Sequence, residues 1–193
     1  MIRGEVVLFN KPFGVLCQFS GDGTRATLAD FVPVAGIYPA GRLDADSEGL
    51  VVLTGDGALQ ARISHPRHKL PKIYFVEVEG VASVAALASL ERGVDLGEFA
   101  SAPATVRRVP PPAWLWPRDP PIRFRKSVPT AWLELSITEG KHRQVRRMTA
   151  AVGLPTLRLI RWSVGPWTLA DLPAGQWRTA SATALPNFRL RAP

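Results

Sequence analysis

The chain has 193 residues, 46% of them hydrophobic, and a formal net charge of +8. This length suits one domain or one body with two lobes, and the hydrophobic fraction excludes a wholly disordered chain. No apolar run reaches the roughly 18 residues that a membrane helix needs, and the first residues do not resemble a secretory leader. The single cysteine, Cys17, fits a reducing compartment, so we expect a cytoplasmic protein with no membrane partner. The charge favours a polyanionic partner such as RNA, and a merely basic surface is the alternative.

Hydrophobic periodicity predicts the secondary structure in chain order. Thr27 is expected to cap a short helix that ends before Pro33, and Asp56 and Ser83 are expected to cap two longer ones. Strands are predicted at 5–9, 50–53, 72–79, 131–137 and 156–162, and helices at 57–64, 83–92 and 143–152. Because strands dominate and helices do not alternate with them regularly, the pattern predicts an α+β fold with a mainly antiparallel central sheet and flanking helices.

Residues 110–129 form a segment rich in proline, tryptophan and arginine, with seven of the 18 prolines. Proline gives no ladder hydrogen bond, so the segment is predicted to be a long connection outside the sheet. Long connections in compact domains are often functional. Its Trp114 and Trp116 either stack on bases or pack the segment onto the body of the protein.

The first candidate site is the acidic run Gly41-Arg42-Leu43-Asp44-Ala45-Asp46-Ser47-Glu48-Gly49-Leu50. Carboxylates on a loop before a buried strand are well placed for catalysis, whereas the alternative is a solvated acidic turn. The spacing does not match a calcium loop. Arg42 favours catalysis, because it places a cation beside a carboxylate that must stay ionised.

The second candidate site is the basic run Glu139-Gly140-Lys141-His142-Arg143-Gln144-Val145-Arg146-Arg147-Met148. In a helix over 143–152, Arg143, Arg146 and Arg147 share one face near the positive helix end. Three like charges on one face repel each other, and this repulsion is more readily tolerated when a phosphate or a carboxylate compensates it. The alternative is an ordinary solvated basic face.

Tyr74 is the third candidate, on the same strand face as Val76 and Val78. It is either a core tyrosine or a ring that stacks on a base with its hydroxyl available for proton transfer. His65, His68 and His142 are dispersed, and no spacing of histidine and cysteine suggests zinc. No phosphate loop is present either, so the sequence predicts neither a metal nor a cofactor.

Together these motifs resemble the pseudouridine synthases of the small-subunit (RsuA) type. The resemblance rests on the Gly41–Leu50 run, Lys72-x-Tyr74, the Glu139–Met148 run and the opening Asn10-Lys11-Pro12-x-Gly14, and it extends from about residue 5 to about 180. It implies a two-lobed catalytic domain over 1–185, followed by a short basic tail at 186–193. Many relatives carry an N-terminal RNA-binding module of the S4 type, which is not expected here.

The resemblance also implies the chemistry. Asp44 is expected to be the catalytic carboxylate that attacks C1′ or removes a sugar proton, and Arg146 is expected to pair with it and keep it charged. Tyr74 is expected to stack on the flipped uracil. The segments Pro112–Arg123 and Pro155–Arg161 are similar to a large-subunit branch of the family. That similarity implies isomerisation of one uridine in the peptidyl-transferase region of 23S rRNA, free or in a large-subunit precursor.

Backbone contacts are expected to offset the cost of flipping the base out of its stack. The predicted RNA-binding residues are Arg42, Lys11, Lys72, Arg143, Arg147, Arg118, Arg123, Arg125 and Lys126. Two alternatives stay open: a synthase that acts on 16S rRNA or tRNA, and a non-catalytic protein of rRNA binding or ribosome assembly. A monomer is expected.

Overall fold

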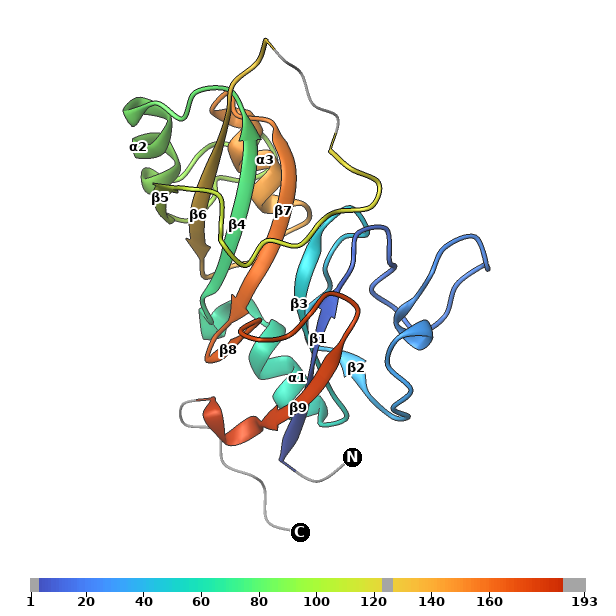
Figure 1. The fold of residues 1–193 in the computed structure, drawn as a ribbon. Coiled ribbons are helices and arrows are strands. Elements are labelled where there is room, and N and C mark those ends of the chain that lie inside the picture. Colours follow the sequence, from blue (N-terminus) through green and yellow to red (C-terminus); the bar gives the residue numbers. More distant parts are fainter. Residues whose placement is uncertain (1–3, 123–126, 186–193) are drawn as a thin grey trace. The chain divides into compact units, whose positions relative to one another are not determined.

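The computed structural model describes residues 4–122 and 127–185, and the chain divides into two compact units. Unit 1 comprises residues 1–70 and 161–193, and unit 2 comprises residues 71–160. The strands are β1 (Glu5–Lys11), β2 (Tyr38–Pro39), β3 (Glu48–Thr54), β4 (Lys72–Glu79), β5 (Thr105–Val109), β6 (Thr130–Ile137), β7 (Thr156–Val164), β8 (Trp167–Thr168) and β9 (Trp177–Ser181) (Figure 1). The helices are α1 (Gly57–Ser64), α2 (Val84–Arg92) and α3 (Gln144–Ala151), and the short 3-10 turns are η1 (Leu28–Asp30), η2 (Pro66–His68) and η3 (Ala182–Ala184).

The sheet of unit 1 has the strand order β7-β3-β1-β9, with β2 paired to β3 and β8 paired to β7. Strand β1 is antiparallel to both of its neighbours, so that Phe9 lies between Val51 of β3 and Trp177 of β9. Every residue of β3 is buried, as expected for an apolar strand covered on both faces. One side of this sheet packs into a core that includes Phe9, Val51 and Leu43.

The sheet of unit 2 has the strand order β5-β6-β4-β7, and β6 is antiparallel to both β5 and β4. Strand β7 contributes residues 156–160 to this unit and residues 161–164 to unit 1. Alternate residues of β4 are buried, and their side chains form one core with Leu90 of α2 and Met148 of α3. The two helices therefore cover the same face of this sheet.

The helix ends follow the predicted capping chemistry. The carboxylate of Asp56 accepts hydrogen bonds from the backbone N–H groups of Ala58 (2.8 Å) and Leu59 (3.0 Å) at the start of α1. Ser83 caps α2 in the same way, and Gly93 ends it at a φ of +91°. The predictions for α1, α2 and β4 are confirmed to within one residue. The helices of the described residues are all too short or too polar to cross a bilayer.

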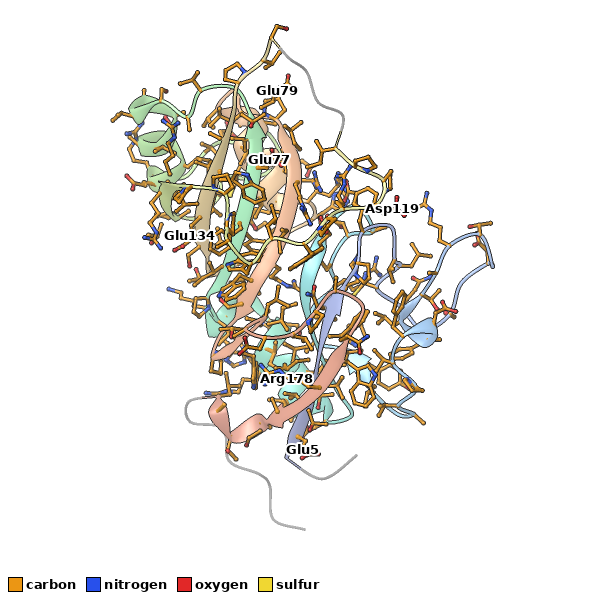
Figure 2. All side chains as sticks on the ribbon, viewed as in Figure 1. Glu5, Glu77, Glu79, Asp119, Glu134 and Arg178 are labelled. Atoms are coloured by element: carbon orange, nitrogen blue, oxygen red, sulfur yellow. The ribbon has the colours of Figure 1, made fainter. Side chains whose placement is uncertain are left out.

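Two edge strands, β5 and β9, were not predicted from the sequence. Only Val106 of β5 is buried, while Arg107 faces the other way and forms an ion pair of 2.6 Å with Glu134 of β6, which Figure 2 labels. Strand β9 has no buried residue at all. Edge strands with one polar face lack the apolar run that marks a central strand, and charged side chains there protect an open edge from pairing with other chains. Trp132 lies on the same face of β6 as Glu134 but is only 5% exposed.

The proline-rich segment contains no strand or helix in its described part, residues 110–122 and 127–129, as predicted. It runs across the face of unit 2 that lies opposite the helices. Trp114 packs edge-to-face on Phe75 of β4 at 5.0 Å between ring centroids, and Trp116 lies 5.9 Å from Trp114. The guanidinium of Arg158 lies over the ring of Trp116 at 5.6 Å. The two tryptophans thus pack this segment onto the body of unit 2. The predicted tail, 186–193, lies outside the described residues.

Candidate active site

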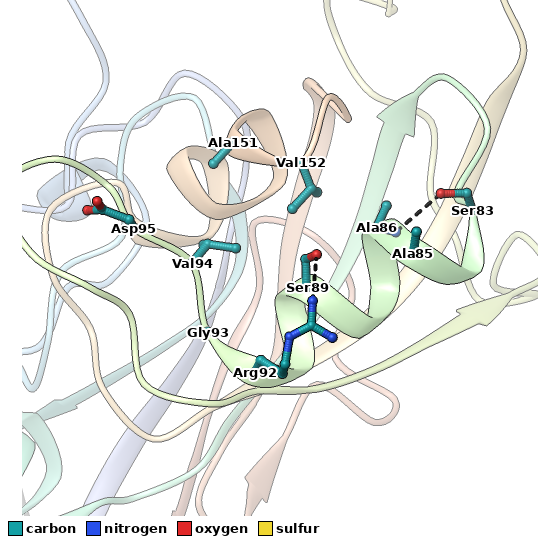
Figure 3. Close-up of a pocket in the computed structure, with 10 residues that line it drawn as sticks. All are labelled: Ser83, Ala85, Ala86, Ser89, Arg92, Gly93, Val94, Asp95, Ala151 and Val152. Carbon is teal, nitrogen blue, oxygen red and sulfur yellow. Dashed lines mark hydrogen bonds between the residues drawn. The ribbon is translucent and has the colours of Figure 1, made fainter.

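A hollow of about 600 Å³ in unit 2 contains none of the predicted site residues (Figure 3). It lies between the outer side of α2 and the end of α3, and small side chains line much of it. Its charged groups are Arg92, which donates to the hydroxyl of Ser89 (3.2 Å), and Asp95. One cation and one carboxylate among alanines and serines do not form a catalytic constellation.

The loop that carries Asp44 belongs to unit 1 and joins β2 to β3. Leu43 is 7% exposed and packs into the core of this unit, whereas Arg42 is exposed and Asp44 is half-buried. The sequence Arg-Leu-Asp therefore places one apolar anchor between two charged side chains. The backbone N–H of Ser47 donates to the carbonyl of Asp44 (3.1 Å), which closes the turn.

Groups from outside the loop hold its backbone at two further carbonyls. The carbonyl of Ala45 accepts from the backbone N–H of Gly14 (2.7 Å) and from Nζ of Lys11 (3.4 Å). The carbonyl of Arg42 accepts from Nη1 of Arg161 (3.3 Å). Asp44 is thus flanked on both sides by anchored peptide groups, which is how a protein holds a reacting group in place with little reorganisation.

Lys11 differs from its predicted role. Its side chain is fully buried, and Nζ also donates to the carbonyls of Pro12 and Val15, both at 2.9 Å. An ammonium group that is saturated by carbonyl acceptors inside the protein does not reach a phosphate in solvent. The prediction that Lys11 contacts RNA is therefore corrected: this lysine supports the loop from below.

Burial lowers the pKa of Lys11 to about 8 from its ordinary value of 10.5, and nearby Cys17 and Glu48 partly oppose this shift. Between these two pH values the unfolded chain binds more protons at Lys11 than the folded chain does. Stability from this group therefore rises as the pH increases from about 8 to about 10.5, by at most about 3 kcal/mol. We expect Lys11→Met to remove that rise.

The measurement is urea unfolding of both proteins at several pH values between about 7 and about 10. The difference between the two unfolding free energies should change with pH, because other titrating groups are common to both chains. If the unfolding free energies of the two proteins changed with pH in parallel, that result would contradict the assignment of Lys11 as a buried group that is mainly charged near neutral pH.

Arg161 was not among the predicted site residues. It lies in β7, is 4% exposed, and donates through Nε to the carbonyl of Leu50 (2.7 Å) in addition to its bond to Arg42. A signal existed in the sequence, since Arg161 stands in the otherwise apolar run Leu159-Ile160-Arg161-Trp162, and a buried arginine in such a strand needs partners. Glu48 is likewise 1% exposed, so it belongs to the interior under the loop and not to a solvated acidic turn.

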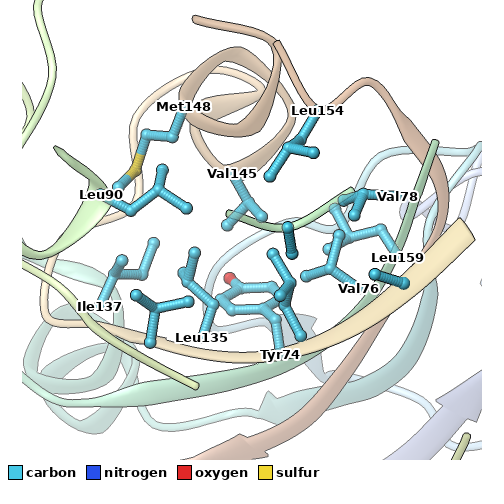
Figure 4. Packing of buried hydrophobic residues seen from close by; sticks show 14 residues of the cluster. Tyr74, Val76, Val78, Leu90, Leu135, Ile137, Val145, Met148, Leu154 and Leu159 are labelled. Atoms are coloured by element: carbon cyan, nitrogen blue, oxygen red, sulfur yellow. The ribbon is translucent and has the colours of Figure 1, made fainter. Parts of the chain in front are cut away.

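Tyr74 and the basic motif belong to unit 2. Tyr74 is 6% exposed, and its ring packs beside Leu135, opposite it on β6, and near Val145 of α3 (Figure 4). The predicted face shared with Val76 and Val78 is confirmed. Lys72 lies two residues before Tyr74 on the same face and is 9% exposed.

The basic motif begins differently from prediction, because α3 starts at Gln144 and not at Arg143. Arg143 precedes the helix in the left-handed conformation, with φ of +49° and ψ of +31°. The predicted helical face of three arginines is therefore wrong. Within the helix only Arg146 and Arg147 are left, and neighbours in sequence point about 100° apart around a helix.

The same motif stabilises its own turn. Oε1 of Gln144 accepts from the backbone N–H of Lys141 (2.9 Å), and its Nε2 donates to the carboxylate of Glu139. Glu139 also accepts from the backbone N–H of Ala102 (2.7 Å). These bonds occupy the polar groups of the turn before α3, so Glu139 and Gln144 shape this motif from within the protein.

Arg147 also has intramolecular partners. Its Nη1 forms an ion pair of 3.0 Å with Glu98, its Nη2 donates to the carbonyl of Leu96 (2.7 Å), and its guanidinium lies 5.1 Å from the ring centre of Phe99. These contacts hold residues 96–99, and the role of Arg147 in RNA binding stays a prediction. Arg146 is half-buried, and its Nη1 lies 3.5 Å from the carbonyl of Thr156.

The remaining predicted RNA contacts lie in or near the proline-rich segment. Arg118 donates to the carbonyls of Pro120 (2.8 Å) and Leu157 (3.4 Å) in unit 2. Arg123, Arg125 and Lys126 lie outside the described residues. Among the residues that the structure describes, no group of three or more histidine, cysteine or carboxylate side chains is arranged to hold a metal ion.

Comparisons with known proteins place these motifs in a family. The model of the RNA pseudouridylate synthase family matches residues 5–151. The chain is 56% identical over 182 residues to ribosomal large subunit pseudouridine synthase E of Xanthomonas campestris, covering 93% of this chain and 97% of that protein. It is 33% identical over 192 residues to ribosomal large subunit pseudouridine synthase B of Bacillus subtilis, covering 97% and 73%.

The fold agrees with this assignment. A crystal structure of a pseudouridylate synthase superimposes with a TM-score of 0.73 at 27% identity, covering 93% of this chain and 72% of that one. The α+β architecture and the match over both units both indicate the pseudouridine synthase fold. The chain belongs to the RNA pseudouridylate synthase family and is a pseudouridine synthase.

Proposed function

We propose that this enzyme isomerises one uridine of 23S rRNA to pseudouridine, in the peptidyl-transferase region, with Asp44 as the catalytic carboxylate. The observation that carries the substrate is the similarity to proteins named ribosomal large subunit pseudouridine synthase E, at 56% identity in Xanthomonas campestris and 52% in Vibrio vulnificus. The observation that carries the residue is the loop of unit 1, in which Asp44 is half-buried between two anchored peptide groups.

The reaction breaks the bond between N1 and C1′, rotates the base and joins C5 to C1′; C5 loses its proton and N1 gains one. No electrons are gained or lost and no group is imported, so side chains and the substrate suffice for its balance. An ionised Asp44 would attack C1′ or remove a sugar proton, which are the two routes open to a carboxylate here. The loop anchors support either route, because both require the carboxylate at a fixed distance from the sugar.

Arg146 would pair with Asp44 in the substrate complex. A guanidinium beside a carboxylate stabilises its charged form, which matters most when RNA binding excludes water. The half-buried position of Arg146 supports this role, because a partly desolvated guanidinium interacts more strongly with an anion than an exposed one does.

Tyr74 would stack on the flipped uracil and assist removal of the C5 proton. Flipping a base out of its stack costs a few kcal/mol, and contacts to the neighbouring phosphates would offset that cost. Because Lys11 is fully buried, the residues proposed for these phosphate contacts are Arg42, Lys72, Arg143, Arg147, Arg118, Arg123, Arg125 and Lys126.

The target is tested by incubating the enzyme with rRNA and tRNA from a strain that lacks the gene, followed by carbodiimide treatment, alkali and primer extension. We expect one new extension stop in 23S rRNA, and none in 16S rRNA or tRNA. The assay is run on free 23S rRNA and on large-subunit particles, and Asp44→Asn protein is the control for chemistry. A stop in 16S rRNA alone would contradict the proposed substrate while leaving the reaction intact.

A further inference from the structure

A cluster of basic residues at the end of α1 has no role in the site proposed above. Residues 57–73 contain no acidic residue, although Asp56 precedes them and Glu77 follows. Within this stretch, eight consecutive positions carry five basic side chains: Arg62, His65, Arg67, His68 and Lys69. All five belong to unit 1.

The turn after α1 brings these side chains together. Helix α1 ends at Ser64, and η2 follows at Pro66–His68. The backbone N–H of Arg67 donates to Nδ1 of His65 (3.2 Å), and Nε of Arg67 donates to Nε2 of His68 (3.2 Å). The two imidazole rings lie 6.2 Å apart, edge to face. His65, Arg67 and Lys69 are exposed, so this cluster faces solvent in unit 1.

The cluster creates a positive potential. The pKa of His68 is lowered, first by partial desolvation and then by the positive charges of Arg67, Arg62 and the neighbouring His65. Cations that oppose the protonation of a histidine attract an anion at the same place. A phosphate there would accept hydrogen bonds from the guanidinium of Arg67 and the ammonium of Lys69.

The large apolar side chains of α1 do not contribute to this surface, since Leu59 and Ile63 are 1% and 0% exposed. Stable protein interfaces need a buried apolar or aromatic centre, whereas nucleic-acid surfaces are polar and strongly positive. The composition of the cluster therefore favours a phosphate backbone over a protein partner.

We propose that Arg62, His65, Arg67, His68 and Lys69 form a second RNA-binding surface of this synthase, which contacts backbone phosphates away from the reacting uridine. This inference rests on the proposed function for the identity of the RNA. Such a surface adds affinity and fixes the orientation of the RNA without reading its bases.

The test is RNA binding by Arg67→Ala, Lys69→Ala and the double variant, measured by filter binding over a range of salt concentrations with a 23S rRNA fragment. We expect the double variant to bind about 10-fold more weakly. The slope of log K against log salt should fall by roughly 1.4, or about 0.7 for each phosphate of single-stranded RNA that is no longer neutralised. The value of kcat at saturating RNA should stay that of the wild type, because neither residue belongs to the catalytic site.

Arg178→Ala is the matched control for Arg67→Ala, because Arg178 is an exposed arginine of the same unit on β9 (Figure 2). The control variant measures how much RNA affinity is lost when the protein loses one positive charge elsewhere on its surface. An Arg67→Ala or double variant that binds RNA no more weakly than the control predicts would overturn the proposal. Binding of the same variants to polyglutamate is measured as well. A double variant that loses binding to polyglutamate but binds RNA as the wild type does would also overturn the proposal, because that result would indicate an acidic protein partner.

A second measurement does not depend on activity. The ring signals of His65 and His68 in NMR spectra should shift when the RNA fragment is added, and unchanged signals would also overturn the proposal. Weakened binding in the double variant, combined with no isomerisation of that RNA by the wild type, would instead leave this surface standing and count against the proposed substrate.

Discussion

Asp44→Asn is expected to lower kcat at least about 10³-fold, because asparagine is nearly the same size as aspartate but supplies neither a nucleophile nor a base. The loop should be unaffected, since it is anchored through the backbone carbonyls of Arg42, Asp44 and Ala45. The measurement is release of tritium from C5-labelled uridine in 23S rRNA. Activity within about 10-fold of the wild type would remove Asp44 from the mechanism.

Binding measured beside activity separates the enzyme from a passive RNA-binding protein. The Asp44→Asn protein should bind the 23S rRNA fragment as tightly as the wild type or more tightly, because it no longer carries a negative charge that repels phosphate. Asp46→Asn is the matched control, since Asp46 is half-buried in the same loop and carries the same charge. Equal losses of kcat in both variants would indicate a general effect of loop charge and not a catalytic role for Asp44.

Gly49→Ala is expected to destabilise the protein by about 3–5 kcal/mol. Gly49 follows the Asp44 loop in β3 at a φ of +105°, which side chains rarely adopt. An added Cβ would lie 2.8 Å from the backbone nitrogen of Arg161 and closer still to its carbonyl oxygen. The backbone conformation costs about 1–3 kcal/mol, and the clash with the backbone of β7 adds a similar amount. Urea unfolding at one pH measures the change.

Gly57→Ala is the control substitution. Gly57 is the first residue of α1, its φ is not positive, and an added Cβ would meet nothing within 4 Å. Alanine there should raise stability by about 0.4–1 kcal/mol, because it restricts the unfolded chain. A Gly49→Ala protein as stable as the wild type would show that β3 and β7 can separate without cost, and would contradict the close packing under the Asp44 loop.

Local signals in the sequence were sufficient for the central elements. Asp56 and Ser83 marked the starts of α1 and α2, since a side-chain cap acts within three residues. Strand β4 was predicted with its observed bounds because alternate burial of its residues leaves a clear pattern. Strands β5 and β9 were missed, because the burial of an edge strand depends on neighbours that are distant in sequence.

For the candidate site, the motifs were sufficient to identify the family, whereas the catalytic roles of Asp44, Tyr74 and Arg146 stay predictions. The motifs could not separate cations that face solvent from cations that support the fold. Arg143 was assigned to a helix because the spacing of the arginines suggested it, whereas a left-handed residue before Gln144 moves it off the helix. The partner of Arg147, Glu98, lies 49 residues away along the chain, and no local pattern predicts such a pair.

The sequence by itself determined the family of this protein, through the order of its motifs, and also its positive charge and the positions of its helix caps. Only the tertiary structure decided that Lys11 lies beneath the Asp44 loop and that Arg161 holds the carbonyl of Arg42. The physical reason is that burial is a property of the packed chain. A lysine or arginine looks the same in sequence whether its charge meets water, RNA or the backbone carbonyls of a distant loop.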